Sequence, residues 1–263
     1  APAPEATEVP SVENRYEQIV PYRLPYLNRA YDCAELTLPA LLPRYGHNST
    51  TVLPTPYQSV GARGVNSLSS KLLMSLFPPN TPFFKQSIED GVIQQMEQAH
   101  GEGTNEFKSA KTQIEKQLGT FERIVMSSVE SSGDRNVLFE GMKHLLVTGN
   151  ALLHHSNEGM RSFPLNQYVV RRDPAGNVLE IILKEEADPI TLPPDIRAAM
   201  LANPTYANKK SVALYTYVGR KETEWVTYQE TCGKIIESTR GTKPLDKNTW
   251  IALRFNRING EDY

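Results

Sequence analysis

The sequence predicts an α+β fold, in which helices fill the first half of the chain and antiparallel strands fill most of the second half. Up to about residue 147, apolar residues recur every three or four positions, a spacing typical of amphipathic helices. Beyond that point, short runs rich in β-branched and aromatic residues alternate with turn-forming residues, which is typical of strands. Because helices precede strands instead of alternating with them, the order favours α+β architecture.

The first elements are two helices. Apolar residues at helical spacing predict a short helix over residues 12–20. Pro25 suits the first turn of a second helix, which Pro39 ends. The apolar stripe of this second helix comprises Leu27, Ala30, Tyr31 and Ala34. Residues 1–14, rich in Ala, Pro and Glu, are expected to form a disordered tail.

Three longer helices follow a loop over residues 41–56 that is rich in Pro, Ser and Thr. The first spans about residues 58–76 and the second about 105–130. The third spans about 134–147, has an N-cap at Ser132 or Asp134, and ends at Gly149–Asn150. The apolar stripe of the middle helix comprises Phe107, Ala110, Ile114, Leu118, Phe121 and Val125, opposite a charged and solvated face.

The second half predicts strands and one short helix. A strand at 151–155 precedes a hairpin over residues 167–183, whose turn is 173–177. A short helix over 192–201 has prolines in its first turn. Four further runs, at 211–219, 224–232, 234–239 and 250–258, are interpreted as one antiparallel meander.

Two glycines, Gly61 and Gly64, stand in the first turns of the 58–76 helix and need a reason, because each costs about 1 kcal/mol relative to alanine. A phosphate-binding loop is disfavoured, because Val65 rather than Lys follows Gly64. We therefore expect close packing against another helix, within the chain rather than between subunits. A bulky residue at Gly64 should then prevent folding, whereas loss of assembly alone would point to a contact between subunits.

Composition excludes several classes of protein. The formal net charge of −2 argues against a protein whose main task is to bind phosphates, although a local basic patch stays compatible with it. Cys33 and Cys232 form neither a disulfide framework nor a zinc motif, which fits a reducing compartment. No apolar run approaches the ~18 residues that a membrane span needs. The first residue is Ala1 and the last segment follows a strand, so a longer parent chain is expected.

No nucleophile, base and orienting partner assemble in the sequence, so we expect no catalytic residue, no cofactor and no metal site. His154 and His155 should point to opposite faces of a strand and are interpreted as structural or surface residues. Arg171 and Arg172 could touch a phosphate or a neighbouring subunit, but are more often solvated charges. The aromatic residues Tyr215, Tyr217, Trp225 and Tyr228 could stack on nucleic-acid bases, but are more often cross-strand core pairs.

Several short motifs, in order along the chain, resemble those of portal proteins, the head-to-tail connectors of short-tailed bacteriophages. They are TPYQ (55–58), GARG (61–64), SKL (70–72), LFP (76–78), LFE (138–140), GN (149–150), LL (152–153), YVV (168–170), RD (172–173), GNVL (176–179), LP (192–193), DIR (195–197) and the terminal residues Arg257, Gly260, Glu261 and Tyr263. Each motif alone is weak, but the ordered set is specific. Residues 87–120 keep helical character without the motif residues.

The resemblance implies the organisation of the chain. Residues 15–150 would be the mainly helical part and 151–263 the mainly β part of the outer wing region, and the stem, clip and crown of such proteins would be absent. The family-motif packing positions would be Gly61, Arg63, Gly64, Gly149, Asn150, Asp173 and Gly176. No position can be assigned to contact DNA.

The resemblance also implies a non-enzymatic role. Twelve copies would form a ring at one vertex of the capsid, assembled in the cytoplasm of the host bacterium, through which double-stranded DNA is packaged and ejected. The implied partners are the major capsid protein, the scaffolding protein, the tail adaptor and tail tube proteins, and, transiently, the terminase. Two alternatives stay open at this point: an adaptor ring of the tail, and a DNA-binding or DNA-processing protein of viral origin.

Overall fold

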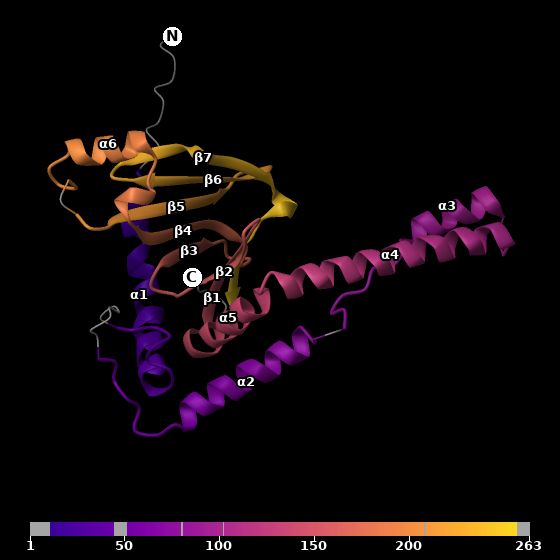
Figure 1. The fold of residues 1–263 in the computed structure, drawn as a ribbon, viewed down its shortest axis with the longest axis horizontal. Helices are drawn as coiled ribbons and strands as arrows, with labels where there is room; N and C mark the ends of the chain where they lie inside the picture. Colours follow the sequence, from indigo (N-terminus) through magenta and orange to yellow (C-terminus); the bar gives the residue numbers. More distant parts are fainter. Residues whose placement is uncertain (1–10, 45–51, 80, 102, 208, 257–263) are drawn as a thin grey trace, which may run out of the picture.

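The structure is a computed structural model that describes residues 11–44, 52–79, 81–101, 103–207 and 209–256. Within them, helices come first and antiparallel strands follow with one short helix among them, which confirms the predicted α+β class (Figure 1). The helices are α1 (Val12–Leu36), α2 (Val60–Leu76), α3 (Asp90–His100), α4 (Asn105–Ser131), α5 (Asp134–Thr148) and α6 (Pro194–Ala202). The strands are β1 (Asn150–Ser156), β2 (Gly159–Phe163), β3 (Tyr168–Arg172), β4 (Val178–Ala187), β5 (Val212–Arg220), β6 (Glu224–Thr231), β7 (Lys234–Pro244) and β8 (Trp250–Arg254).

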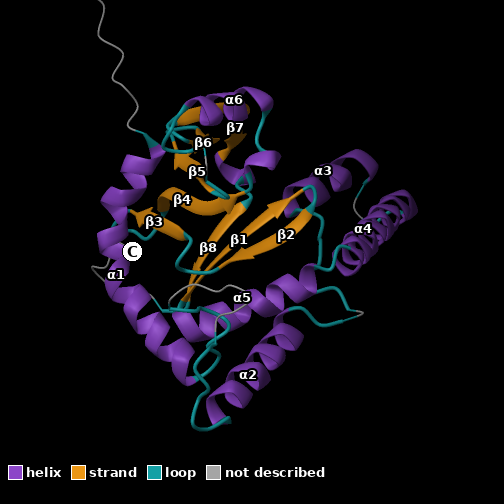
Figure 2. Ribbon diagram, turned by 60° about the vertical axis from the view of Figure 1, so that its left-hand side comes forward, coloured by secondary structure: helices purple, strands orange, loops and turns teal. Residues whose placement is uncertain are grey.

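The strands form two sheets, with the orders β2-β1-β8 and β3-β4-β5-β6-β7 (Figure 2). The expectation of a single meander from β5 to β8 is therefore wrong for β8, which pairs with β1 so that Leu152 lies opposite Ala252. A 3₁₀ turn, Leu245–Lys247, separates β7 from β8. The ring of Trp250, in β8, stacks on that of His154, in β1, with centroids 3.9 Å apart. The sequence pattern of a strand predicts the strand but not the strand with which it pairs. The packing of Trp250 on His154 accompanies the pairing of β8 with β1.

The first helix is continuous from Val12 to Leu36, so the prediction of two separate helices is wrong. Pro21 and Pro25 lie inside α1, and both are exposed. A proline removes one hydrogen bond from a helix, which usually breaks it. In α1 the buried residues continue on one face across both prolines, from Tyr16 through Arg23 to Ala34. Packing against the rest of the chain therefore holds the two halves together.

The five-stranded sheet packs on both faces, because successive residues of each strand point to opposite sides. One face, with Val169 of β3 and Ile182 of β4, meets the first half of α1. The opposite face, with Val170 and Ile181, meets the second half of α1, α5 and the three-stranded sheet. Helix α6 covers a further cluster, with β5 and β7, at the end of the sheet. The core thus lies around the two sheets.

The remaining helices lie outside this core. Helix α5 packs on β1 and β2 and also contacts α1 and α2. Helix α4 projects away from the two sheets, and α3 packs beside its far end (Figure 1). We call α3 and α4 the helical arm. The arm gives the molecule an elongated outline in this view.

Some boundaries differ from those expected. Residues 12–14 belong to α1, so the predicted disordered tail is wrong for them, while residues 1–10 lie outside the described part of the chain. Strand β2 was not predicted, and α3 was not distinguished within the segment of helical character at 87–120. Strand β2 has only five residues, and one of them is Gly159. In so short a strand the alternation of apolar and polar residues is hard to recognise in the sequence.

Candidate functional site

Gly61 lies where α2 crosses the end of α1. A side-chain carbon built on Gly61 would lie 2.9 Å from the carbonyl oxygen of Leu36 and 3.0 Å from Cγ2 of Thr37. Only glycine lets the two backbones approach this closely. At this position, the geometry agrees with a close helix contact inside the chain.

Gly64 lies one turn further along α2 and is different. Apart from its chain neighbours and the adjacent backbone of α2 itself, no heavy atom of the described residues lies within 4 Å of a side-chain carbon built there. The expected close contact of Gly64 within the chain is therefore wrong, because the space beside Gly64 is open. Arg63, the neighbouring motif residue, is also exposed.

Gly149 and Asn150 form the junction between α5 and β1. Gly149 has a φ of 73°, in the left-handed region that favours glycine, and its amide donates to the carbonyl of Leu145 at 3.1 Å. Asn150 starts β1 opposite Arg254 of β8. The amide of Phe255 donates to the carbonyl of Gly149 at 2.9 Å, so this junction also connects to the residue after β8.

Asp173 and Gly176 shape the turn between β3 and β4. The Asp173 carboxylate accepts from the backbone amide of Asn177 at 2.7 Å and from its side-chain amide at 2.8 Å. The side-chain hydrogen bond from Asn177 is the largest cause that lowers the pKa of Asp173. Gly176 has a φ of 90°, which a residue with a side chain rarely adopts. In this structure both motif residues serve the geometry of the turn.

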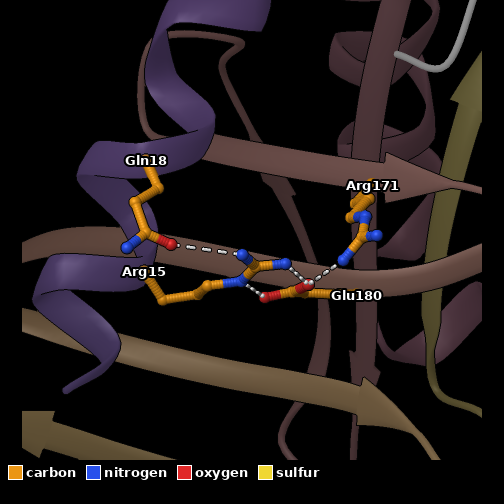
Figure 3. Close-up of polar contacts among 4 residues, drawn as sticks. All are labelled: Arg15, Gln18, Arg171 and Glu180. Atoms are coloured by element: carbon orange, nitrogen blue, oxygen red, sulfur yellow. Dashed lines mark hydrogen bonds and ion pairs between the residues drawn. The ribbon is translucent and has the colours of Figure 1, made fainter. Parts of the chain in front are cut away.

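A polar cluster that the sequence did not predict joins the first turns of α1 to the sheet (Figure 3). Arg15 donates two hydrogen bonds to the carboxylate of Glu180 in β4, at 2.7 and 2.8 Å. These bonds are the largest cause that raises the pKa of the Arg15 guanidinium. Arg171 approaches the same carboxylate at 3.9 Å, and Gln18 accepts from Arg15 at 3.2 Å. The side chain of Glu180 is only 9% exposed, so this pair is held largely out of water.

Two further contacts fix α1. At its start, the carboxylate of Glu230 in β6 accepts from the amide of Val12 at 2.8 Å and from the hydroxyl of Ser11. A negative charge at a helix N-terminus is favourable, and the helix has no side-chain cap of its own. Further along, the buried Arg23 donates to the carbonyl of Tyr168 at 2.7 Å. It also donates to the carbonyls of Leu165 and Asn166, which precede Tyr168 in the chain. We call Arg15, Arg23, Glu180 and Glu230 the α1 clamp.

The α1 clamp could have been suspected from one signal. Glu180 stands at an inward position within the apolar run Val178–Leu183 of a predicted strand. A carboxylate in such a position needs a partner. The sequence does not say which of the arginines provides it, because Arg15 is far from Glu180 along the chain.

The histidines lie where a structural role is expected. Burial lowers the pKa of His144, in α5, to about 4. Burial is also the largest cause that lowers the pKa of His154 to about 4, with Lys243 and Arg161 adding to it. His154 stacks on Trp250 and His155 is exposed, in agreement with the interpretation of this pair as structural or surface residues.

The aromatic residues of β5 and β6 are core pairs, as the sequence favoured. Tyr217 and Tyr228 face one another across the two strands with ring centroids 5.0 Å apart. Trp225 is buried and donates to the carbonyl of Leu245. These rings are therefore not an open platform for stacking bases. Arg172, one of the two arginines considered as phosphate contacts, donates to the carbonyls of Gly176 and Ala252.

One cavity of about 300 Å³ is lined by several charged side chains, among them Glu13, Lys184 and Glu186. Another cavity, of about 380 Å³, is apolar and lies between α5 and the three-stranded sheet, where Leu138, Met142 and Ile251 line it. A further cavity, of about 340 Å³, lies between the sheets, and five of its ten lining residues are threonines. In the described ranges, no group of three or more His, Cys, Asp or Glu side chains could hold a metal ion. No described helix is both long and apolar enough to span a membrane.

Comparison with known proteins gives one family and several curated relatives. The sequence profile of the family described as "Bacteriophage head to tail connecting protein" matches residues 9–263. The portal protein of Escherichia phage T7 is 35% identical over 259 residues, and that of Enterobacteria phage T3 is 35% identical over 258 residues. The portal protein of Enterobacteria phage SP6 is 30% identical over 253 residues. Each alignment covers 94% of this chain. It covers 46% of the T7 and T3 proteins and 47% of the SP6 protein. The chain therefore spans about half the length of the curated relatives it matches.

Proposed function

Because the chain belongs to the family of bacteriophage head to tail connecting proteins, we propose that it forms the wing region of a portal subunit. The observation that carries this proposal is the family match, which extends over nearly the whole chain. In this proposal, residues 15–150 form the helical part of the wing and residues 151–263 the β part.

In this proposal the protein has a structural role and no catalytic one. Twelve copies form a ring at one vertex of the capsid, and double-stranded DNA passes through the ring during packaging and ejection. Closed rings need side-to-side contacts in which two different surfaces of each copy meet. Permanent interfaces of this kind commonly bury about 2,000 Å² or more. The exposed large apolar side chains of α2, α3 and α4 support such contacts, because Val60, Leu68, Val92 and Ile124 are each at least 42% exposed.

The partners and location are part of the same proposal. The ring sits in the virion, where the capsid and tail meet, after assembly in the host cytoplasm. It contacts the major capsid protein and the scaffolding protein on the head side, and the tail adaptor and tail tube proteins on the tail side. The terminase binds transiently while DNA enters. A near-neutral subunit suits a conduit, because tight binding to phosphates would oppose sliding of the DNA.

Electron microscopy of the purified protein that carries this chain tests the ring. We expect annular particles with a central hole, and class averages that count the subunits. A protein that stays a single globule at the concentrations of assembly would contradict the proposal. Labelling of the intact virion should place the protein at a single vertex.

The alternative of a DNA-processing protein makes a different prediction. It requires cleavage or joining of double-stranded DNA in the presence of divalent metal ions. We propose no catalytic activity, and expect that DNA incubated with Mg²⁺ and the purified protein stays intact. The alternative of a tail adaptor is disfavoured, because the relatives from phages T7, T3 and SP6 are named portal proteins.

A further inference from the structure

The cavity of about 340 Å³ between the two sheets, which we call the threonine cavity, is lined by side chains from both of them. Strands β1 and β8, with the residue before β8, form one wall, and β5, β6 and β7 form the other (Figures 1 and 2). Among the described residues, its lining includes five threonines, one glutamine, one histidine and one lysine, but neither Asp nor Glu. A cavity of this size can hold a small molecule.

An irregular stretch of β7 shapes one side of the threonine cavity. Strand β7 inserts residues 237–240 where β6 has the single residue Tyr228, which makes a wide bulge in the pairing of the two strands. Within the bulge, the hydroxyl of Thr239 donates to the carbonyl of Ile236 at 2.7 Å and accepts from the amide of Gln229 at 2.9 Å. These bonds hold the bulge in place. Bulges commonly redirect side chains next to functional sites.

The hydrogen bonds around the threonine cavity leave donors available to a ligand. The side-chain amide of Gln229 donates to the hydroxyl of Thr216 at 3.1 Å, and Nζ of Lys243 donates to the hydroxyl of Thr249 at 3.1 Å. A hydroxyl that accepts a hydrogen bond keeps its own hydrogen for another acceptor, and an ammonium group has three N–H donors. The lining therefore offers hydroxyl and ammonium hydrogens, but no carboxylate of the described chain to accept them.

The positive charge of Lys243 faces this space. Burial is the largest cause that lowers the pKa of His154, and Lys243, Arg161 and His155 add to it, so His154 is neutral at neutral pH. The guanidinium of Arg161 is paired with Glu185 at 2.6 Å. Lys243, in contrast, donates to a neutral hydroxyl and has no carboxylate partner within the described part of the chain. A ligand of negative charge would therefore be favoured beside it.

We propose that the threonine cavity binds the phosphate group of a small molecule, either inorganic phosphate or a nucleotide. In this site the phosphate accepts hydrogen bonds from Lys243 and from the hydroxyls of Thr216 and Thr249. These donors belong to both walls, and the tetrahedral phosphate has oxygens on all sides to meet them. A bound phosphate would thus connect the two sheets. The inference goes beyond the proposed function and does not depend on the ring.

A small phosphate ligand fits the lining better than other classes of ligand do. A cation would find no carboxylate in this cavity, and an apolar ligand would leave the hydroxyls and the ammonium group without partners. Double-stranded DNA is bound by rows of Lys and Arg that follow its backbone, whereas Lys243 is the single Lys or Arg among the described residues that line the cavity.

Calorimetric titration of the purified protein at neutral pH tests the site with three ligands: inorganic phosphate, thymidine monophosphate and unphosphorylated thymidine. We expect the two phosphate ligands to bind with dissociation constants in the millimolar range or tighter, and thymidine not to bind. Tighter binding of thymidine monophosphate than of inorganic phosphate would identify a nucleotide as the ligand, and equal binding would identify the free ion. No binding of either phosphate ligand at millimolar concentrations would overturn the proposal.

Matched variants test which residues hold the phosphate. Lys243→Gln should weaken binding about tenfold or more, because it removes the charged donor. Thr249→Val keeps the shape of the side chain and removes its hydroxyl, and should weaken binding about threefold or more. Lys234→Gln is the control, since Lys234 is an exposed residue of the same strand that does not line the cavity, and it should change the affinity less than about twofold. Circular dichroism checks the fold of each variant.

The two tryptophans locate the bound ligand. Trp250 lines the threonine cavity, whereas Trp225 donates to the carbonyl of Leu245 and does not line it. In nuclear magnetic resonance spectra, phosphate should shift the indole N–H signal of Trp250 and leave that of Trp225 unchanged, and the variant Trp225→Phe assigns the two signals. A shift of the Trp225 signal alone would place the ligand elsewhere and overturn the site.

The remaining outcomes also decide the inference. Equal weakening by Lys243→Gln and Lys234→Gln would show a general attraction of anions and would overturn the site. Binding of a short DNA duplex that Lys243→Gln abolishes, without binding of the small ligands, would assign the cavity to nucleic acid instead. Each of these results leaves the portal proposal standing, because that proposal is tested by the rings seen in electron microscopy.

Discussion

At the scale of single residues, the most consequential side chains are buried charges that hold α1 on the sheet. Arg15 and Glu180 form two parallel hydrogen bonds, a geometry that orients both side chains as well as pairing their charges. A mostly buried ion pair stabilises a fold little in comparison with apolar packing, but loss of one partner is costly. The pair therefore acts chiefly to fix the position of α1.

Removing Arg15 should destabilise the chain. We expect Arg15→Ala to lower the free energy of unfolding by about 2 kcal/mol, because the carboxylate of Glu180 would stay mostly buried with only the more distant Arg171. Gln18→Ala is the matched control, since it removes an exposed contact of the same arginine and should change the free energy by less than ~0.5 kcal/mol. Urea denaturation followed by circular dichroism measures both. Equal losses for the two variants would show that Glu180 is not the important partner.

His144 should make stability depend on pH. Its pKa is lowered from 6.5 to about 4 by burial, so the unfolded chain binds the proton more tightly than the folded chain. Its contribution is complete above pH 6.5 and is lost as the pH falls towards 4, on the order of 3 kcal/mol in total. His144→Leu should flatten the dependence of the unfolding free energy on pH in this window, while His154 is retained in both proteins. An unchanged slope in the variant would contradict this assignment.

At the scale of elements, the contact between α1 and α2 separates the roles of two glycines that look alike in the sequence. Both stand in the first turns of α2. At Gly61 the backbone of α1 fills the space that a side chain would need, whereas at Gly64 that space is open within the described chain. The same residue type therefore serves packing inside the chain at one position and lies on an open part of the helix surface at the other.

Substitution by alanine should distinguish the two positions. Gly61→Ala should lower the free energy of unfolding by roughly 1–2 kcal/mol, because its Cβ would approach the carbonyl of Leu36 too closely. Gly64→Ala should raise it by about 0.5–1 kcal/mol, because alanine favours a helix and meets no neighbour. Thermal unfolding of the two variants checks this. A bulky residue at Gly64 should also permit folding, which differs from the expectation based on the sequence alone. If Gly64→Ala were less stable than the parent protein, the position could not be open as the structure shows it.

At the scale of the whole molecule, the chain divides into a packed body and the helical arm. The two sheets, α1, α5 and α6 share the buried clusters. In the arm, α3 contacts mainly α4, and Phe121 and Ile124 of α4 are 49% and 63% exposed. Segments with few buried apolar contacts open locally at low free energy. The free arm is therefore expected to be the least protected helical region.

Hydrogen exchange should detect this difference and its change on assembly. In the unassembled protein, amides of α3 and of the far half of α4 should exchange faster than those of α5, which packs on two strands. In rings, exchange in α3 and α2 should slow, while α6 should change little. Mass spectrometry of peptides from both states measures the effect. Equal protection of α3 in the two states would argue against burial of the arm between copies.

Much of the fold follows from local sequence. The periods of α2, α4 and α5, the cap at Gly149 and the turn at Asp173–Gly176 were all predictable, because each depends on residues close together in the chain. The continuity of α1 through its two prolines was not, because packing against distant strands outweighs their local effect. The contacts of the α1 clamp could not be predicted for the same reason, because Glu180 and Glu230 meet α1 only in the folded chain.

The sequence by itself determined the α+β class, most element boundaries and, through ordered motifs, the resemblance to portal proteins, because these depend on local spacing and residue type. Only the tertiary structure decided that β8 pairs with β1, that Gly61 is packed while Gly64 is open, and that the helical arm projects away from the two sheets. The physical reason is that local propensities act over a few residues. Pairing of strands, burial of charges and exposure of a helix face depend on which distant segments the folded chain brings together.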